Sequence, residues 1–481
     1  MNQPPEDPKP STDVARSGPP FSQLPLSSAA LANLTRLGYH AMTPIQAASL
    51  PLALAGHDLI AQAKTGSGKT AAFALTLLFN LKLDRSGVQA LVLCPTRELA
   101  DQVATEIRRV ARAEENLKVL TLCGGSPIRP QIASLEHGAH IVVGTPGRVM
   151  DHLQRDTLRL DALHTLVLDE ADRMLDMGFY GDIVTVASQC PVDRQTLLFS
   201  ATYPEGIARL ARQFLRDPKE VKLLDQHAAT KIRQRFYEVD EISRLQAVPR
   251  LLLHFRPVRT IAFCNTKQQC RDLVELLESE GIVALALHGD LDQRDRDQVL
   301  VQFVNKSCSV LVATDVAARG LDIERLEAVV NVDITRDPEV HVHRIGRTGR
   351  VDEDGWALSL ASPRDMGNVE RIEEMQGTKA EWHTLTELVP RGREPLVPPM
   401  VTLQILGGRK EKIRAGDVLG ALTGEAGFDA KQIGKITVNE SATYVAVDRR
   451  IGAQAVQKLS AGKVKGKTVR VRLLRPSDSR S

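Results

Sequence analysis

The sequence predicts an α/β fold in which two tandem parallel-sheet domains are followed by a small α+β domain. Three observations lead to this fold class. The chain has 481 residues, which is too many for one ordinary domain. Between about residue 21 and residue 331, short apolar runs alternate with longer helical segments, as in βαβ units. A proline-rich segment at residues 390–399 then separates a last region with a different order of elements.

The domain boundaries are expected where the composition changes. Six prolines and few apolar residues predict a disordered leader at residues 1–20. The first parallel-sheet domain is expected at residues 21–220 and the second at residues 221–390, with a polar stretch near residues 216–235 between them. A linker at residues 391–400 leads to the third domain at residues 401–475, and residues 476–481 form a short disordered tail.

The expected strands are short apolar runs that end in polar or glycine-containing residues. Strands covered on both faces have this continuous apolar character, and open α/β sheets place their chemistry where the strands end. In the first domain the runs are residues 59–61, 90–94, 119–122, 141–143, 166–168 and 196–199. In the second they are residues 260–264, 283–287, 310–313 and 328–331.

The third domain has the order strand, helix, strand, strand, helix, strand. These elements are expected at residues 402–406, 416–422, 434–438, 443–447, 453–459 and 468–473. The βαββαβ order is that of a ferredoxin-like, RNA-recognition-like fold.

Composition excludes several classes of protein. The chain is 43% hydrophobic and 25% charged, and no apolar run approaches the roughly 18 residues of a membrane span. The N-terminus lacks the apolar core of a signal peptide, so we expect a cytoplasmic protein with no membrane association. Six scattered cysteines without a C-x-x-C pair predict buried thiols and no structural metal. We expect a monomer.

Charge is concentrated at the C-terminus. Residues 400–481 contain 16 Lys and Arg against 7 Asp and Glu, a net charge of +9. Because the whole chain carries +3, the first 399 residues carry −6. A basic terminal module indicates a polyanion partner, although a solvated basic face would have the same composition.

Residues 63–70 have the pattern of a phosphate-binding loop between an apolar strand and an Ala/Leu-rich helix. Such a loop needs glycines so that backbone N–H groups can face phosphate oxygens, a lysine for the terminal phosphates and a hydroxyl for Mg²⁺. Its first residue departs from the usual glycine. The candidate nucleotide-binding residues are Ala63, Lys64, Thr65, Gly66, Ser67, Gly68, Lys69 and Thr70.

Two carboxylates, Asp169 and Glu170, follow the apolar run 166–168. An isolated pair of this kind is also typical of a strand end that starts a helix. With the phosphate loop present, we expect Asp169 and Thr70 to be the Mg²⁺-side residues, since Mg²⁺ takes only one or two protein carboxylates. Glu170 would then orient or deprotonate a water.

With these motifs, Asp169-Glu170-Ala171-Asp172 and Ser200-Ala201-Thr202 make the chain resemble a DEAD-box RNA helicase with two RecA-like lobes of the P-loop NTPase class. The resemblance covers nearly everything after residue 21. Residues 38–46 resemble the adenine-reading motif of the family, which implies ATP as the nucleotide and Phe21, Tyr39 and Gln46 as adenine-side residues. It also implies roles in coupling the two sites for Asp172, Ser200, Thr202 and His343.

The resemblance further assigns residues to RNA and to the second lobe. Implied RNA-backbone contacts are Pro95, Thr96, Arg97, Gly125, Thr145 and Arg148 in the first lobe, and Arg296 and Thr314 in the second. Gly320 and Asp322 are implied to reach the nucleotide. Arg347 and Arg350 are implied to supply positive charge to the transferred phosphoryl group when the lobes close. The implied catalytic residues are therefore Lys69, Asp169, Glu170, Arg347 and Arg350. RNA that spans both lobes would favour closure and so stimulate ATP hydrolysis.

Specificity is expected from the third domain. Its third strand lacks the usual aromatic platform in register, which argues against base stacking on the sheet. Lys410, Lys412 and Arg414 are the candidate RNA contacts, and the region resembles the tail of the DbpA group of DEAD-box proteins. That resemblance implies binding to a 23S ribosomal RNA hairpin and to pre-50S particles, hence large-subunit assembly.

The sequence therefore predicts an ATP-dependent RNA helicase that acts on ribosomal RNA. Two alternatives remain open at this point: a general cytoplasmic RNA helicase without ribosomal specificity, and an ATP-gated RNA clamp or chaperone that opens little duplex. Strand opening and clamping use the same closure, so the sequence does not separate them. A DNA helicase is disfavoured by the motif set.

Overall fold

The computed structural model describes residues 18–63, 66–223, 232–318, 326–349, 355–392 and 396–474. The chain divides into two compact units, residues 1–226 and 227–481, and the second unit contains both the second parallel sheet and the C-terminal domain. No helix in the described part of the chain combines the length and apolar character needed to cross a bilayer.

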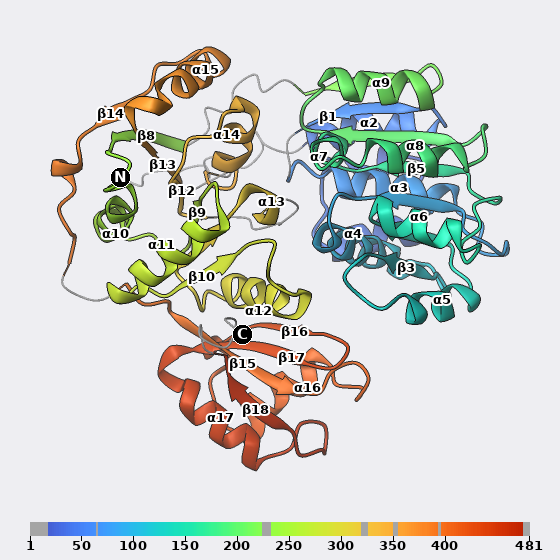
Figure 1. Ribbon diagram of the computed structural model, residues 1–481. Helices are drawn as coiled ribbons and strands as arrows, with labels where there is room; N and C mark the ends of the chain where they lie inside the picture. Colours follow the sequence, from blue (N-terminus) through green and yellow to red (C-terminus); the bar gives the residue numbers. More distant parts are fainter. Residues whose placement is uncertain are drawn as a thin grey trace, which may run out of the picture. The chain divides into compact units, whose positions relative to one another are not determined.

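The first unit is a seven-stranded parallel sheet with helices on both faces (Figure 1). The strand order is β3-β4-β2-β5-β6-β1-β7. The strands are β1 (Leu59–Gln62), β2 (Ala90–Leu93), β3 (Val119–Leu122), β4 (Ile141–Gly144), β5 (Thr165–Leu168), β6 (Gln195–Ser200) and β7 (Lys219–Lys222). The helices are α1 (Ser28–Arg36), α2 (Pro44–Leu54), α3 (Lys69–Asn80), α4 (Arg97–Val110), α5 (Ile128–Glu136), α6 (Pro146–Gln154), α7 (Ala171–Asp176), α8 (Tyr180–Ser188) and α9 (Glu205–Phe214).

Alternate residues of the central strands belong to two separate cores. In β5, Leu166 and Leu168 pack into the core on one face of the sheet, whereas Val167 packs into the core on the other. All three side chains are fully buried. This two-sided burial is why the strands read as unbroken apolar runs, since a strand of a covered parallel sheet has no solvent face.

The second unit repeats this design in a sheet with the order β10-β11-β9-β12-β13-β8-β14, again parallel throughout. Its strands are β8 (Ile232–Glu238), β9 (Thr260–Phe263), β10 (Ala284–Leu287), β11 (Val310–Ala313), β12 (Ala328–Asn331), β13 (Gly355–Ala361) and β14 (Trp382–His383). Its helices are α10 (Arg244–Phe255), α11 (Lys267–Ser279), α12 (Gln293–Val304), α13 (Asp315–Ala318), α14 (Pro338–Ile345) and α15 (Met366–Gln376).

The C-terminal domain is a four-stranded antiparallel sheet with the order β16-β17-β15-β18. Its elements are β15 (Met400–Leu406), α16 (Ala415–Gly420), β16 (Ile433–Val438), β17 (Thr443–Asp448), α17 (Gly452–Ala461) and β18 (Arg470–Leu473). The predicted βαββαβ order is confirmed, and so is the predicted fold class of two RecA-like lobes followed by this domain.

One face of the C-terminal sheet packs against α12 within the second unit. Val301 contacts a small buried cluster formed by Ala442, Tyr444 and Leu474. Thr402 is fully buried, and its hydroxyl oxygen accepts a hydrogen bond of 3.1 Å from the Asn305 side-chain amide. The face that would carry aromatic stacking residues in an RNA-recognition fold is therefore partly covered by the chain itself.

The ends of the predicted strands agree with the structure within two residues, but four strands of the structure were not predicted. The segment near residues 216–235, expected to be polar connecting chain, contains β7 and the start of β8, and β13 and β14 were also missed. In β7 only Val221 is buried, and in β8 only the adjacent residues Phe236 and Tyr237 are buried. Neither strand shows the continuous apolar run that identified the central strands.

A buried arginine ties the strand ends of the second lobe together. Arg344, on α14, is almost fully buried and donates two hydrogen bonds of 2.7 Å to the Asp315 carboxylate and a third of 2.7 Å to the Asp333 carbonyl. Its role could not be predicted from the sequence, since the motif around it contains other arginines. A paired buried charge is strongly destabilising to break.

We expect Arg344→Ala to lower the free energy of unfolding of the second unit by about 3–5 kcal/mol, because it leaves the Asp315 carboxylate without its partner. Urea unfolding followed by tryptophan fluorescence measures this directly, since both tryptophans, Trp356 and Trp382, lie in this unit. Arg364→Ala is the matched control: Arg364 pairs with Glu241 on the exposed surface, and its loss should cost about 0.5 kcal/mol or less. Equal effects of the two substitutions would contradict this role.

Candidate nucleotide and RNA sites

The phosphate loop lies where β1 passes into α3. Gly66 and Gly68 have φ angles of +74° and +97°, a backbone conformation that favours glycine. A Cβ on Gly68 would approach the Gln46 amide nitrogen to 2.6 Å, so a side chain there would displace Gln46. The Ser67 hydroxyl is buried and has no hydrogen-bond partner within the described chain. An unpartnered buried hydroxyl beside a helix N-terminus fits an anion such as a phosphate group.

Lys69 and Gln46 fix this loop from inside. The Lys69 ammonium donates a hydrogen bond of 2.6 Å to the Ala63 carbonyl, and its side chain is buried. The Gln46 amide donates 3.0 Å to the Gly68 carbonyl, while its oxygen accepts from the Thr43 N–H. Lys64 and Thr65 lie outside the described residues.

Asp169 and Glu170 follow β5 at the same edge of the sheet. Burial raises the pKa of the Asp169 carboxyl to about 7, although the charge of Lys69 opposes this. A carboxylate so poorly solvated is stabilised by a cation, which fits the donor set for Mg²⁺. Glu170 has φ +50° and ψ +50°, and its carboxylate accepts 2.8 Å from Arg173. Arg173 was missed by the sequence analysis; its signal was the i, i+3 spacing from Glu170.

Asp172, at the start of α7, lies beside Ser200 and Thr202 at the end of β6. One Asp172 oxygen accepts hydrogen bonds from the Ala201 N–H, the Thr202 N–H and the Thr202 hydroxyl, at 3.1, 2.9 and 3.0 Å. The Asp172 N–H donates to the Ser200 hydroxyl at 3.3 Å. The Ser200 carbonyl in turn accepts from the Ala63 N–H at the start of the phosphate loop. A continuous hydrogen-bonded path thus links the carboxylate segment to that loop.

Tyr39 joins this region to α4. Its hydroxyl donates 2.6 Å to Glu106 and accepts 2.8 Å from Arg109. Burial, followed by the Glu106 hydrogen bond, raises the pKa of Tyr39 to about 12. The buried Phe21 ring packs edge-on against Tyr39, with centroids 6.3 Å apart. The structure therefore places Phe21 and Tyr39 together.

The candidate RNA residues of the first lobe lie at the ends of β2, β3 and β4, which are neighbours in the sheet. Thr96 caps α4 by accepting the Leu99 N–H, and Arg97 begins that helix. Gly125 has φ +74° in the loop after β3. Arg148, after β4, donates 3.0 Å to the Ser126 carbonyl of that loop. Pro95 and Thr145 are the residues that precede α4 and α6.

In the second lobe, Arg296 and Thr314 lie close together. Arg296, on α12, donates 2.7 Å to the carbonyl of Ala317 in α13, which directly follows Thr314. His343 lies on α14, and Arg347 follows this helix as a largely buried residue. Gly320, Asp322 and Arg350 lie outside the described residues, so their expected roles stay predictions.

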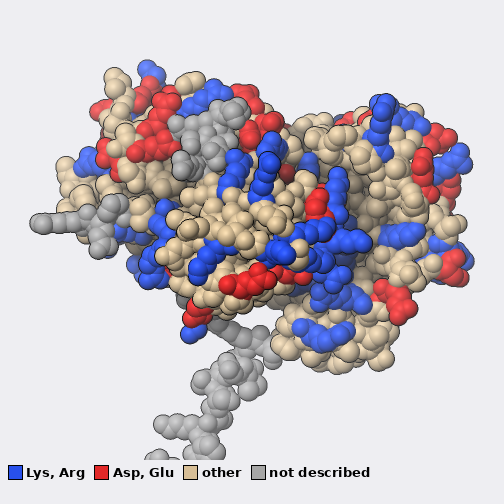
Figure 2. Space-filling view, turned by 90° about the horizontal axis from the view of Figure 1, so that it is seen from below, with Lys and Arg blue, Asp and Glu red and all other residues tan. Residues whose placement is uncertain are grey.

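Two basic loops of the C-terminal domain lie side by side. The Lys465 ammonium donates a hydrogen bond to the Lys412 carbonyl, which joins the loop 407–414 to the loop 463–467. Lys410, Lys412 and Arg414 are all exposed. Figure 2 views the molecule from below and shows Lys and Arg side chains across this side, with Asp and Glu among them. We call the exposed Lys and Arg side chains of these two loops the basic loop pair: Arg409, Lys410, Lys412, Arg414, Lys463, Lys465 and Lys467.

Comparison with known proteins decides the family. The family models DEAD/DEAH box helicase, Helicase conserved C-terminal domain and DbpA RNA binding domain match residues 43–210, 243–352 and 402–473. Over 450 residues the chain is 53% identical to the ATP-dependent RNA helicase DbpA of Escherichia coli (strain K12), covering 94% of this chain and 98% of that protein. The chain belongs to the DEAD-box ATP-dependent RNA helicases.

Other DEAD-box relatives match the two lobes. The DEAD-box ATP-dependent RNA helicase CshA of Geobacillus kaustophilus (strain HTA426) is 45% identical, covering 75% of this chain and 77% of that protein. Among solved structures, S. cerevisiae Dbp5 bound to RNA and ADP BeF3 is similar with a TM-score of 0.70 and 30% identity, covering 76% of this chain and 96% of that one. The predicted DEAD-box family, its DbpA branch and the RNA helicase activity are confirmed, as are the use of ATP and the binding of RNA.

Proposed function

We propose that this DEAD-box helicase uses ATP hydrolysis to open short RNA duplexes beside a 23S ribosomal RNA hairpin that its C-terminal domain holds, during assembly of the large ribosomal subunit. The observation that carries the proposal is the basic loop pair, which lies in the region matched by the DbpA RNA binding domain. Its position on loops supports recognition of a folded RNA by its backbone and shape.

The proposed nucleotide site uses the buried edge of the first lobe. Lys69 and Thr70 hold the terminal phosphates, and Thr70 and Asp169 hold Mg²⁺ with its waters. Bound Mg²⁺ would neutralise phosphate charge. Glu170 orients the attacking water, and its left-handed backbone and the ion pair with Arg173 support this role because they fix the carboxylate at the strand end.

The second lobe is proposed to complete hydrolysis. Arg347, with Arg350, supplies positive charge to the transferred phosphoryl group when the lobes close, and phosphoryl transfer depends mainly on such positioning and charge neutralisation. Arg97, Gly125 and Arg148 hold one part of the RNA backbone, whereas Arg296 and Thr314 hold another. RNA that contacts both sets favours the closed state by its differential affinity, so RNA binding and ATP binding promote each other, and RNA stimulates hydrolysis.

Stimulation of ATPase by defined RNAs tests this proposal. We expect an RNA that contains the large-subunit hairpin to reach half-maximal stimulation at a concentration at least about tenfold lower than an unrelated hairpin of equal length. Equal concentrations for both RNAs would favour the general helicase. ATP turnover without release of an annealed strand would favour the clamp.

A further inference from the structure

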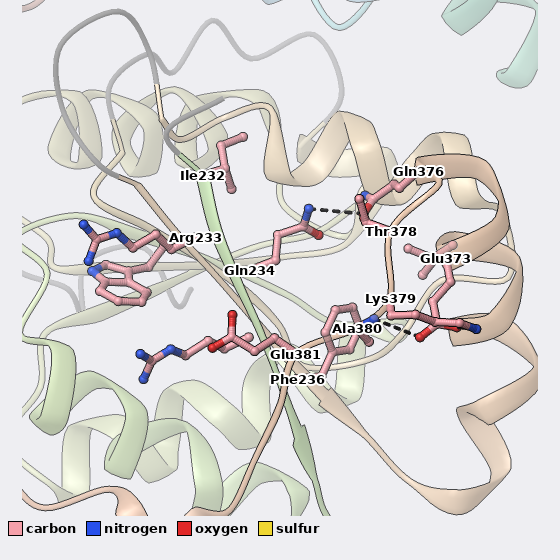
Figure 3. A pocket seen from close by; sticks show the side chains of 13 residues that line it. Ile232, Arg233, Gln234, Phe236, Glu373, Gln376, Thr378, Lys379, Ala380 and Glu381 are labelled. Atoms are coloured by element: carbon pink, nitrogen blue, oxygen red, sulfur yellow. Dashed lines mark hydrogen bonds and ion pairs between the residues drawn. The ribbon is translucent and has the colours of Figure 1, made fainter. Parts of the chain in front are cut away.

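A slot beside β8 in the second lobe is separate from every nucleotide and RNA residue named above. The cavity has a volume of about 340 Å³ (Figure 3). It lies between β8 on one side and the end of α15 with the chain that follows it on the other. We call it the β8 slot and define it by Arg233, Gln234, Arg235, Gln376, Thr378 and Lys379.

The backbone of β8 is open along this slot. β13 pairs with β8 over its whole length, but β14 pairs with it only at Phe236 and Tyr237. The Phe236 N–H donates 2.9 Å to the Glu381 carbonyl, so the N–H and C=O groups of every second residue, Gln234 and Ile232, face the same side. Among the described residues, neither of these two has a strand partner on that side. Unpaired strand backbone is a template for an added strand.

The floor of the slot is held in place. The Gln234 side-chain amide donates 3.1 Å to Gln376 on α15, and its oxygen lies 3.3 Å from the buried His341 Nε2 on α14. The His341 ring stacks on Phe236, with centroids 6.1 Å apart and planes 22° from parallel. Figure 3 shows Gln234 directed toward Gln376 while Arg233 points to the opposite side of the strand. The slot is therefore preformed, which lowers the entropic cost of binding.

The two faces of β8 offer different chemistry to an added strand. On one face, the guanidinium groups of Arg233 and Arg235 lie 5.5 and 5.0 Å from the centre of the Trp356 ring. On the other face lie Phe236 and Ile372, which are both buried. Side chains of a neighbouring strand alternate between these faces, so residues that meet the arginines should be acidic and those between them aliphatic.

Two acidic side chains also line the slot, but each has a cationic or histidine partner. Glu373 pairs with Lys379 at 2.7 Å and accepts the Ala380 N–H, which lowers its pKa. Glu381 lies 2.8 Å from His383 Nε2. Both acidic side chains that line the slot are therefore engaged within the chain.

We propose that the β8 slot binds an extended peptide segment of a partner protein, in which acidic and aliphatic residues alternate, as an added strand of the second-lobe sheet. A peptide satisfies the open N–H and C=O groups of β8, whereas the phosphates of RNA supply acceptors only and leave the carbonyls unmatched. The period of two follows from strand geometry.

Fluorescence anisotropy with labelled heptapeptides tests the proposal on the full-length protein. The probe alternates Glu and Val. Three comparison peptides replace Glu with Lys, group the four Glu before the three Val, or carry N-methyl groups on alternate amides. We expect the probe to bind with a Kd below about 1 mM and each comparison peptide to bind at least about tenfold more weakly.

Protein variants give the second arm. The double substitution R233E and R235E should weaken probe binding at least about tenfold, because it replaces attraction with repulsion on one face of the slot. The matched control, R364E and R371E, makes the same charge change on exposed arginines of this lobe outside the slot and should bind as the unaltered protein does. Basal ATPase activity verifies that both variants are folded.

Four results would overturn the proposal: no binding up to about 1 mM, equal binding of the N-methylated or grouped peptide, equal loss in the two protein variants, or displacement of the probe by a uridine heptanucleotide at the same concentration as by unlabelled probe. The N-methylated peptide tests strand pairing without any change in the protein, so the proposal does not depend on the folding of one variant.

Discussion

Glu170→Gln should bind ATP and RNA as the unaltered protein does and hydrolyse ATP about 10²- to 10⁴-fold more slowly. The substitution keeps the size of the side chain and an oxygen that can accept the Arg173 hydrogen bond, now 2.8 Å long. It removes the negative charge that we propose orients the attacking water. Lys69 and Asp169 are untouched, so nucleotide binding should persist.

Single-turnover hydrolysis and titration with a fluorescent ATP analogue separate these two effects. Glu205→Gln, which changes an exposed residue at the start of α9, is the matched control and should turn over normally. Turnover by Glu170→Gln at the rate of the control would remove Glu170 from the chemistry. Loss of nucleotide binding would instead indicate that the ion pair with Arg173 holds the site together.

Removal of residues 400–481 should leave basal ATPase activity and abolish the preference for the 23S hairpin over an unrelated RNA, a loss of about tenfold or more in half-maximal RNA concentration. Deletion also uncovers Val301 on α12 and Asn305 just after this helix, which the C-terminal sheet contacts in the intact chain. Substitutions on the basic loop pair avoid this exposure, because Lys410, Lys412 and Arg414 point into solvent.

Single substitutions of these three residues by alanine should each raise the half-maximal RNA concentration. Each should also lower the slope of log affinity against log salt concentration by about one, because one fewer counterion is released on binding. Arg450→Ala is the matched control. Arg450 is also exposed and basic, and it pairs with Asp448 at 2.7 Å. It follows the C-terminal end of β17, whereas the loop 407–414 contacts the turn before the other end of that strand. An unchanged preference in the loop variants and in the deletion would place RNA specificity in the lobes.

Much of the fold could be predicted because central strands of a covered parallel sheet leave a continuous apolar signal. Val167, between two buried leucines of β5, is an example, since neighbouring residues pack on opposite faces. Strands near a sheet edge lack that signal. β8 alternates arginine with Gln234 and Phe236, and its segment was therefore expected to be connecting chain.

The site residues could be predicted where one short sequence motif carries the chemistry. They were harder to predict where the interacting residues are far apart in the sequence. The phosphate loop and Asp169 could be named from the sequence, because each spacing has a physical requirement. Arg344 could not, since its role depends on Asp315 and the Asp333 carbonyl meeting it in space. The covering of the C-terminal sheet by α12 was equally invisible, because that contact joins residues about 140 positions apart in the chain.

Strand release from a short duplex tests the central claim most directly. Two substrates carry the same duplex, one beside the 23S hairpin and one beside an unrelated hairpin, and release is measured with the full-length protein at limiting enzyme. We predict ATP-dependent release at least about tenfold faster from the first substrate, and no release from either by Glu170→Gln. Equal release from both substrates, or ATP turnover on the first without strand release, would contradict the account.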